Sequence, residues 1–176
     1  MSNEFDLMAE FDNGQIKDQD SVEIDLNGVH SFEEAKTEAA ESMEVGVDEI
    51  EFIGVNAYST NTNLQALADN VEWGDILTDK DGMDTIEDFL ALDLHDQIVS
   101  IHLSNFHGIS LRDGMNDLDN SFVQIFGNEN DIVNDWIELY EVPERVIWYL
   151  DKELILEDVY PNREALANGD IIVVSM

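Results

Sequence analysis

Carboxylates are the most abundant side chains in this sequence that could take part in a reaction, since 41 of its 176 residues are Asp or Glu. A pair of carboxylates can cleave a glycosidic bond, but only where one particular pair is held at a fixed separation. Acidic pairs recur along this whole chain, so spacing singles out no catalytic pair. The nucleophile-elbow, P-loop and dinucleotide-binding patterns are also missing. We therefore expect a protein that is not an enzyme and has no catalytic residues.

Metal-binding chemistry is also poorly supported by the sequence. Asp79-Lys80-Asp81-Gly82 resembles the start of a calcium loop. An EF-hand loop, however, needs Gly at its sixth position and Glu at its twelfth, where Asp84 and Leu90 stand. The histidines are scattered, and no cysteine is present to supply a thiolate. They are His30, His95, His102 and His107. We predict no metal site and no cofactor.

Acidic residues do recur at helical spacing on the outer sides of three predicted helices. Like charges three or four residues apart weaken a helix by a few tenths of a kcal/mol per pair. The acidic stripes are therefore not explained by helix stability. We predict that they present negative charge to a partner. The three stripes are Glu34, Glu38 and Glu41; Asp84, Glu87 and Asp88; and Asp131, Asp135 and Glu138.

The formal net charge of −34 limits the classes of partner. A net charge of about 2 to 8 keeps a small domain soluble, and a larger excess destabilises the fold by self-repulsion. Nucleic acid and anionic membranes would repel such a surface. The N-terminus lacks a basic segment followed by an apolar one, and no run approaches the ~18 apolar residues of a membrane span. We expect a cytoplasmic protein that binds neither nucleic acid nor membrane directly.

The stretch 127–158 should form two helices that meet at Val142-Pro143, because proline cannot continue the first but suits the start of the second. Apolar residues recur at helical spacing in both. On the first helix the apolar side consists of Ile132, Val133, Trp136, Ile137 and Tyr140, and on the second of Val146, Ile147, Leu150 and Leu154.

The remaining elements alternate between strands and helices. A hairpin is predicted from the alternation of Phe5 to Phe11 and of Val22 to Leu26, with a turn at Asn13-Gly14. Ser31 should cap a helix that ends near Glu44. Further strands are expected at 48–55, 122–126 and 171–174, and further helices at 64–74 and around 84–90, with a short one capped by Ser110. The segment Gln97–Arg112 has no acidic residue, so we predict that it is buried or forms an interface.

These elements predict the α+β class, as an elongated chain of about three small α/β subdomains with acidic helices on the surface. The expected divisions are an N-terminal α+β part (1–56), a mainly helical central part (57–108) and a C-terminal α+β part (109–176). An apolar content of 44% is enough for a folded core.

The charge excess can be compared with that of DNA. Duplex DNA carries one charge per about 1.7 Å of axis, so −34 corresponds to roughly 17 base pairs, or about 58 Å. A compact chain of this length has a diameter of only about 40 Å. An elongated or paired molecule would therefore present carboxylates at DNA-like density. Such a protein competes for the basic groove of a DNA-binding enzyme.

Residues 110–158 resemble the ArdA antirestriction proteins, DNA mimics encoded by phages and mobile elements. The resemblance covers a short acidic helix, the strand Phe122–Phe126, the acidic helix NENDIVNDWIELY, and VPERVIWYLD with its final aromatic-x-Asp. SFEEAK, IEFIGV and NLQALA follow the family's order nearer the N-terminus. The chain departs from the family because EFDLMAEFDNGQ lacks the usual Asn-Leu-x-x-Tyr turn and YLDKELILED lacks Arg-Asp-Leu.

The resemblance implies inhibition of type I restriction-modification enzymes of the host through the DNA groove of their methyltransferase core. It also implies a curved homodimer with the segment from Glu141 to Asp151 near its two-fold axis. The residues expected at that dimer interface are Glu141, Val142, Pro143, Ile147 and Trp148.

Three alternatives remain open from the sequence. One is a DNA mimic aimed at another nucleic-acid enzyme, such as a CRISPR nuclease. Another is an acidic domain adapted to high salt, although such proteins favour Ala, Gly, Val and Thr and this chain is rich in Ile and Asn. The third is a low-affinity cation-binding protein.

Overall fold

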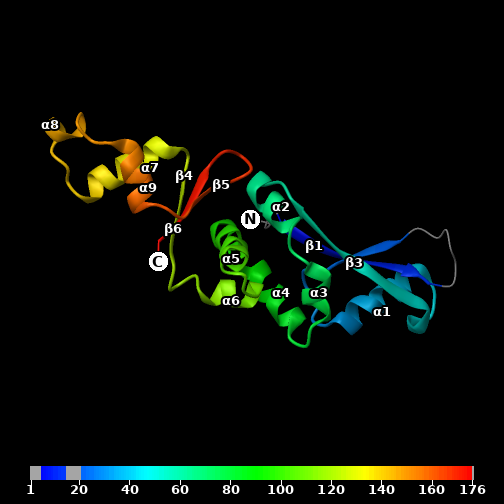
Figure 1. Ribbon diagram of the computed structural model, residues 1–176. Coiled ribbons are helices and arrows are strands. Elements are labelled where there is room, and N and C mark those ends of the chain that lie inside the picture. Colours follow the sequence, from blue (N-terminus) through cyan, green and yellow to red (C-terminus); the bar gives the residue numbers. More distant parts are fainter. Residues whose placement is uncertain (1–4, 15–20, 176) are drawn as a thin grey trace. The chain divides into compact units, whose positions relative to one another are not determined.

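The computed structural model describes residues 5–14 and 21–175, and the chain divides into two compact units (Figure 1). Unit 1 comprises Met1–Asn116 and unit 2 comprises Asp117–Met176. Each unit contains its own three-stranded antiparallel sheet and its own helices, which confirms the mixed α+β class. No helix in the described part of the chain is long and apolar enough to cross a membrane.

Unit 1 begins with the predicted hairpin. Strands β1 (Phe5–Asn13), β2 (Val22–Asp25) and β3 (Ile50–Ser59) form an antiparallel sheet in the order β2-β1-β3. Alternate β1 side chains, Phe5, Leu7, Ala9 and Phe11, are buried, as the period of two predicts. Gly14 begins the connection to β2, and residues 15–20 of that connection lie outside the described residues.

An irregularity in β3 explains why its apolar residues do not strictly alternate. Phe11 lies opposite Phe52, but Glu10 lies opposite Gly54, so Ile53 is an extra residue in the strand. Phe52 and Val55 therefore lie on the same side of the sheet although they are three residues apart. The strand begins later than predicted, since residues 47–49 form a short 3₁₀ turn, η1 (Val47–Glu49), and it continues to Ser59.

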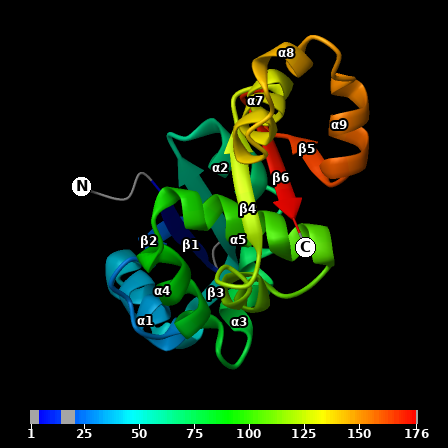
Figure 2. The ribbon, with the colours of Figure 1, turned by 90° about the vertical axis from the view of Figure 1, so that its left-hand side faces the viewer.

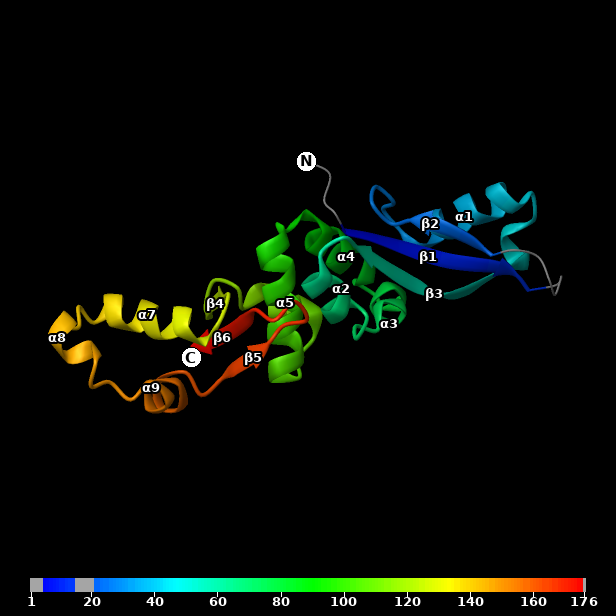
Figure 3. The same ribbon diagram turned by 90° about the horizontal axis from the view of Figure 1, so that it is seen from above.

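Helix α1 (Phe32–Met43) lies along the sheet of unit 1 (Figure 3). Its N-cap is Ser31, as predicted, and the Ser31 hydroxyl accepts a hydrogen bond from the Glu34 N–H at 3.1 Å. The Glu34 carboxylate accepts instead from the N–H of His30, at 2.8 Å, one residue before the expected capping-box donor. The helix ends at Glu44, whose φ is 56°.

In the described part of unit 1, five further helices follow β3. They are α2 (Thr62–Ala68), α3 (Trp73–Thr78), α4 (Gly82–Ala91), α5 (Leu94–His107) and α6 (Leu111–Asn116). The expectation of a single helix over 64–74 is wrong. The Asn70 side chain donates to the Ala66 carbonyl at 2.8 Å, and such a side-chain bond to the backbone competes with helix continuation. Trp73 starts the next helix, and its indole N–H donates back to the Ala68 carbonyl at 2.9 Å.

The core of unit 1 joins the sheet to these helices. The rings of Phe5, Trp73 and Phe89 lie 5.2–6.0 Å apart. In α5, the run Gln97–Leu103 is buried on every side, which confirms burial for that part of the acid-free segment. Ser110 caps α6, also as predicted, by accepting from the Asp113 N–H at 3.1 Å.

Unit 2 contains strands β4 (Phe122–Phe126), β5 (Arg163–Ala165) and β6 (Ile171–Ser175) in the order β4-β6-β5. Its helices are α7 (Glu129–Leu139), α8 (Glu144–Ile147) and α9 (Lys152–Val159). Figure 2 shows α8 at the opposite end of the unit from the end of β6. A small core is formed by Ile132, Val133, Ile155, Leu156, Tyr160 and Val173.

The prediction of one helix after Pro143 is wrong, because that segment forms two. Asp151 is the cause: its side chain accepts a hydrogen bond from the Leu154 N–H at 3.1 Å and so starts α9 as a new helix. The break shifts the buried side of the segment. Leu154, predicted to be buried, is 52% exposed, whereas Ile155 and Leu156 are buried. Val146, also expected inside, is 39% exposed.

Both predicted subdomain boundaries fall within unit 1. The boundary after residue 56 lies inside β3, and the one after residue 108 lies between α5 and α6, which pack against each other. The three-part division and the elongated shape stay predictions.

Candidate functional site

The acidic stripe of α1 lies on the exposed side of that helix. Ala35, Ala39 and Ala40 are buried on its other side, so a row of small residues fixes which side faces outward. Glu34, Glu38 and Glu41 are all exposed. Ser31, as the N-cap, sets where the helix starts and hence the direction in which these three carboxylates point.

The stripe of α4 is arranged in the same way. Asp84, Glu87 and Asp88 are exposed. The opposite side of the helix buries Ile86, Phe89 and Leu90, as the sequence predicted.

His30 joins these two stripes. Its ring Nδ1 lies 2.9 Å from the Glu87 carboxylate of α4, and its backbone N–H donates to the Glu34 carboxylate of α1 at 2.8 Å. The pKa of His30 is raised by the hydrogen bond with Glu87, and further by the charges of Glu87 and Glu34. A protonated His30 therefore places one positive charge between the stripes, and this charge is lost as the pH rises.

Two arginines are committed to local structure and compensate only a few carboxylates. Arg112 lies 4.0 Å from Asp81 and 3.9 Å from Asp88. Arg163 lies 3.5 Å from Glu129 and also donates to the backbone carbonyls of Leu156 and Tyr160. Exposed pairs at these distances contribute about 0–1 kcal/mol. They do not neutralise the stripes.

The stripe of α7 starts at the helix cap. The Asn128 side chain accepts from the Asn130 and Asp131 N–H groups and donates to the Asp131 carboxylate at 2.8 Å. Asp131 and Glu138 are exposed and Asp135 is half-buried, while Ile132 and Val133 are buried on the other side.

A fourth acidic surface, on the outer side of the sheet in unit 1, was not predicted. Glu10 lies directly opposite Glu23 on neighbouring strands, and Asp12 lies directly opposite Glu51. Like charges in such cross-strand positions destabilise a sheet. The signal was present in the sequence, because Asp6, Glu10 and Asp12 occupy the positions that alternate with the buried residues of β1.

Neutral donors hold two of these sheet carboxylates in place. Asn56 Nδ2 donates to Glu10 at 3.3 Å and to Glu23 at 2.9 Å, and the Tyr58 hydroxyl donates to Glu23 at 2.8 Å. The pKa of Tyr58 is raised, first by this hydrogen bond to Glu23. The carboxylates are thus ordered without being neutralised.

The residues expected at a dimer interface all lie between α7 and α9 of unit 2. Glu141 has a φ of 47°, which ends α7, and the Val142 N–H donates to the Ile137 carbonyl at 3.0 Å. Pro143 precedes α8, where Ile147 is half-buried. Trp148 is 88% exposed. Their role in dimer formation stays a prediction.

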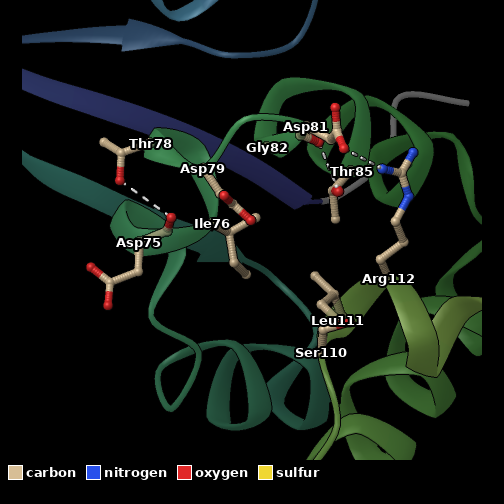
Figure 4. A pocket seen from close by; sticks show the side chains of 10 residues that line it. All are labelled: Asp75, Ile76, Thr78, Asp79, Asp81, Gly82, Thr85, Ser110, Leu111 and Arg112. Carbon is tan, nitrogen blue, oxygen red and sulfur yellow. Dashed lines mark hydrogen bonds and ion pairs between the residues drawn. The ribbon is translucent and has the colours of Figure 1, made fainter.

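A cavity in unit 1 has a volume of about 590 Å³ (Figure 4). The hydroxyl groups of its lining already have partners. Thr85 donates to the Asp81 carbonyl at 3.0 Å, Thr78 to the Gly74 carbonyl at 3.0 Å, and Ser110 to the Asp113 carboxylate at 2.7 Å. Its lining contains no histidine that could act as a general base; it consists of Asp75, Ile76, Thr78, Asp79, Asp81, Gly82, Thr85, Ser110, Leu111 and Arg112.

The calcium-like stretch borders this cavity and has a structural explanation. The Asp79 carboxylate accepts from the Lys80 N–H at 2.8 Å, and Asp81 faces Arg112. A Cβ on Gly82 would lie 1.9 Å from the Ile76 carbonyl oxygen, so glycine is needed for close packing of the backbone. Within residues 5–14 and 21–175, no group of three or more His, Asp or Glu side chains is arranged to hold a metal ion.

Comparisons of this chain with protein-family models, with curated proteins and with solved structures found no match.

Proposed function

We propose that this protein is a DNA mimic that inhibits a DNA-binding enzyme by occupying its basic groove. The observation that carries the proposal is the placement of carboxylates where they weaken the fold. Carboxylates of β1 lie directly opposite carboxylates of the neighbouring strands β2 and β3. Others recur at helical spacing on the exposed sides of α1 and α4. A surface that costs stability within the chain is explained by what it binds outside it.

The charge is distributed over both units, as a mimic of a uniform polymer requires. Unit 1 has 27 Asp and Glu against four Lys and Arg, a net charge of −23 over 116 residues. Unit 2 has 14 against three, a net charge of −11 over 60 residues. Both carry about one net negative charge per five residues. This even density favours a distributed field over one discrete acidic site.

The target we propose is the methyltransferase core of a type I restriction-modification enzyme, on the strength of the resemblance to the ArdA proteins. The stripes of α1, α4 and α7 would take the positions of phosphates, and the outer sheet surface of unit 1 would add to them. The segment 141–148 would join two copies. Inhibition would need no catalytic residue and no cofactor.

The proposal is tested by competition. A labelled DNA duplex bound to a purified type I methyltransferase core is titrated with this protein at 50 and 500 mM NaCl. We expect near-stoichiometric displacement at low salt and much weaker displacement at high salt, because opposite fields steer association and salt screens them. No displacement at either salt would reject the target. Displacement that salt does not change would reject the mimicry itself.

A further inference from the structure

Unit 2 contains a groove in which apolar side chains lie beside two carboxylates of the α7 stripe. It has a volume of about 350 Å³ and is lined by residues of β4 and of the C-terminal ends of α7 and α9. Its lining consists of Phe122, Gln124, Asp135, Glu138, Leu139, Tyr140, Val159 and Tyr160. We call it the β4–α7–α9 groove.

The walls of this groove are apolar and open to solvent. Phe122 is 62% exposed, Leu139 68% and Tyr140 62%. The Tyr140 ring is held against the Trp136 ring, with centroids 5.1 Å apart, so one wall is positioned before any ligand binds. Large apolar side chains gathered on an otherwise charged surface mark an interaction site.

The groove also carries uncompensated negative charge. Asp135 and Glu138 lie in its lining, which contains no Lys or Arg. Arg163 follows Tyr160 closely in the chain but is engaged by Glu129 and by two backbone carbonyls. Tyr160 is buried, and its pKa is raised by that burial and then by the charge of Asp135. Its hydroxyl therefore stays neutral, so the negative charge of the groove comes from Asp135 and Glu138.

We propose that the β4–α7–α9 groove binds a segment of the partner protein in which an aliphatic or aromatic side chain is flanked by Lys or Arg. The apolar side chain would lie between Phe122, Leu139 and Tyr140. The flanking cations would meet Asp135 and Glu138. The proposal rests on the proposed function only for the identity of the partner, whose DNA-binding surface is basic.

Charge argues against a second copy of this chain as the occupant. Its most exposed aromatic segment, 141–153, does carry Arg145 and Lys152. It also carries Glu141, Glu144, Asp151 and Glu153, which gives four acidic residues against two basic ones and a net charge of −2. Asp135 and Glu138 would repel this segment, whereas a basic segment is attracted.

The inference is tested with two peptides and without the enzyme, so its failure is separate from a failure of the proposed function. Acetyl-KRLFRK-amide carries apolar anchors and acetyl-KRGSRK-amide carries none, at the same charge. Both are titrated into the ¹⁵N-labelled protein at 50 and 500 mM NaCl. At 500 mM we expect KRLFRK to retain binding and to shift amides of residues 122–124, 135–140 and 159–160. KRGSRK should bind diffusely and only at low salt.

Variants assign the effect to the groove. Leu139→Ser and Tyr140→Ser change exposed side chains, so the fold should persist, and each should weaken KRLFRK binding at high salt at least fivefold. Leu94→Ser, at an exposed apolar residue of unit 1, is the matched control and should change nothing. Equal binding of the two peptides, or no effect of Leu139→Ser, overturns the proposal. So does a wild-type dimer that Leu139→Ser converts to a monomer, because the groove would then be a contact between copies.

Discussion

The two units carry negative charge at the same density but differ in what else they expose. Among the described residues, 13 large hydrophobic side chains are exposed, and eight of them belong to unit 2, which has about half the residues of unit 1. In unit 1 the exposed ones are Val47, Ile53, Tyr58, Leu94 and Phe106. In unit 2 they are Phe122, Leu139, Tyr140, Val146, Trp148, Tyr149, Leu154 and Val159.

This difference predicts different kinds of contact for the two units. A surface that is only charged binds in a salt-dependent way and with little geometric selectivity. Apolar side chains add contacts that salt does not screen. If the proposed function holds, unit 1 would contribute mainly electrostatic competition with DNA, and unit 2 would add contacts that select a particular protein.

The largest effect should come from the core of unit 2. Ile132 is completely buried in a small cluster, so Ile132→Ala should destabilise that unit by about 2–5 kcal/mol. Amide hydrogen exchange resolved by residue would show the loss. Leu139→Ala, at an exposed position of the same helix, is the control and should change stability by no more than about 0.5 kcal/mol. If Ile132→Ala speeds amide exchange in unit 1 as much as in unit 2, the two units unfold together. They would then not differ in stability.

A change of association is expected from the segment between α7 and α9. Ile147→Glu adds a charge beside the exposed Trp148 and should convert a dimer into a monomer, as seen by sedimentation equilibrium. Ile53→Glu makes the same change at an apolar residue of unit 1 that is 53% exposed. It should leave the mass unchanged. A mass that Ile147→Glu does not alter would reject the interface assignment, and one altered equally by Ile53→Glu would remove the contrast between the units.

Charge removal should act alike on both units. Two triple variants each remove three charges. The variant in unit 1 is Glu34→Gln, Glu38→Gln, Glu41→Gln, and the variant in unit 2 is Asp131→Asn, Asp135→Asn, Glu138→Gln. Each should weaken displacement of DNA several-fold at 50 mM NaCl and hardly at 500 mM, because the lost attraction is screened. Any single replacement should have little effect. One Asp→Asn that abolished inhibition would instead indicate a discrete site.

The elements set by local signals were predictable from the sequence. Ser31 and Ser110 cap helices where expected, and the alternation in β1 identified its buried side. The wrong helix boundaries came from polar residues whose side chains form hydrogen bonds with the backbone. The Asn70 side chain competes with the helix backbone for the Ala66 carbonyl, and the Asp151 side chain starts a new helix by accepting from the Leu154 N–H. The spacing of hydrophobic residues reveals neither effect. One helix was therefore predicted over 64–74, where the structure has α2 and α3, and one after Pro143, where it has α8 and α9.

The candidate surfaces were predictable only in part. Helical stripes are visible as spacing within one segment, and the acidic residues of the stripes on α1 and α4 are exposed. The opposition of Glu10 to Glu23, and of Asp12 to Glu51, depends on strand register. Register across β1 and β3 includes a bulge at Ile53, which no local pattern specifies.

The smallest effect expected is a pH dependence confined to unit 1, since all four histidines lie there. The folded-state pKa of His30 is raised above its usual value of about 6.5, chiefly by the hydrogen bond with Glu87. Its contribution to stability is therefore fully present below about pH 6.5 and is lost as the pH rises through the raised value. An NMR titration of His30 should show a lower pKa in Glu87→Gln, whereas Asp84→Asn, on the same helix, should have a smaller effect. Equal pKa values in wild type and Glu87→Gln would show that the hydrogen bond between His30 and Glu87 does not persist in solution, and His30 would then contribute no pH dependence to the stability of unit 1.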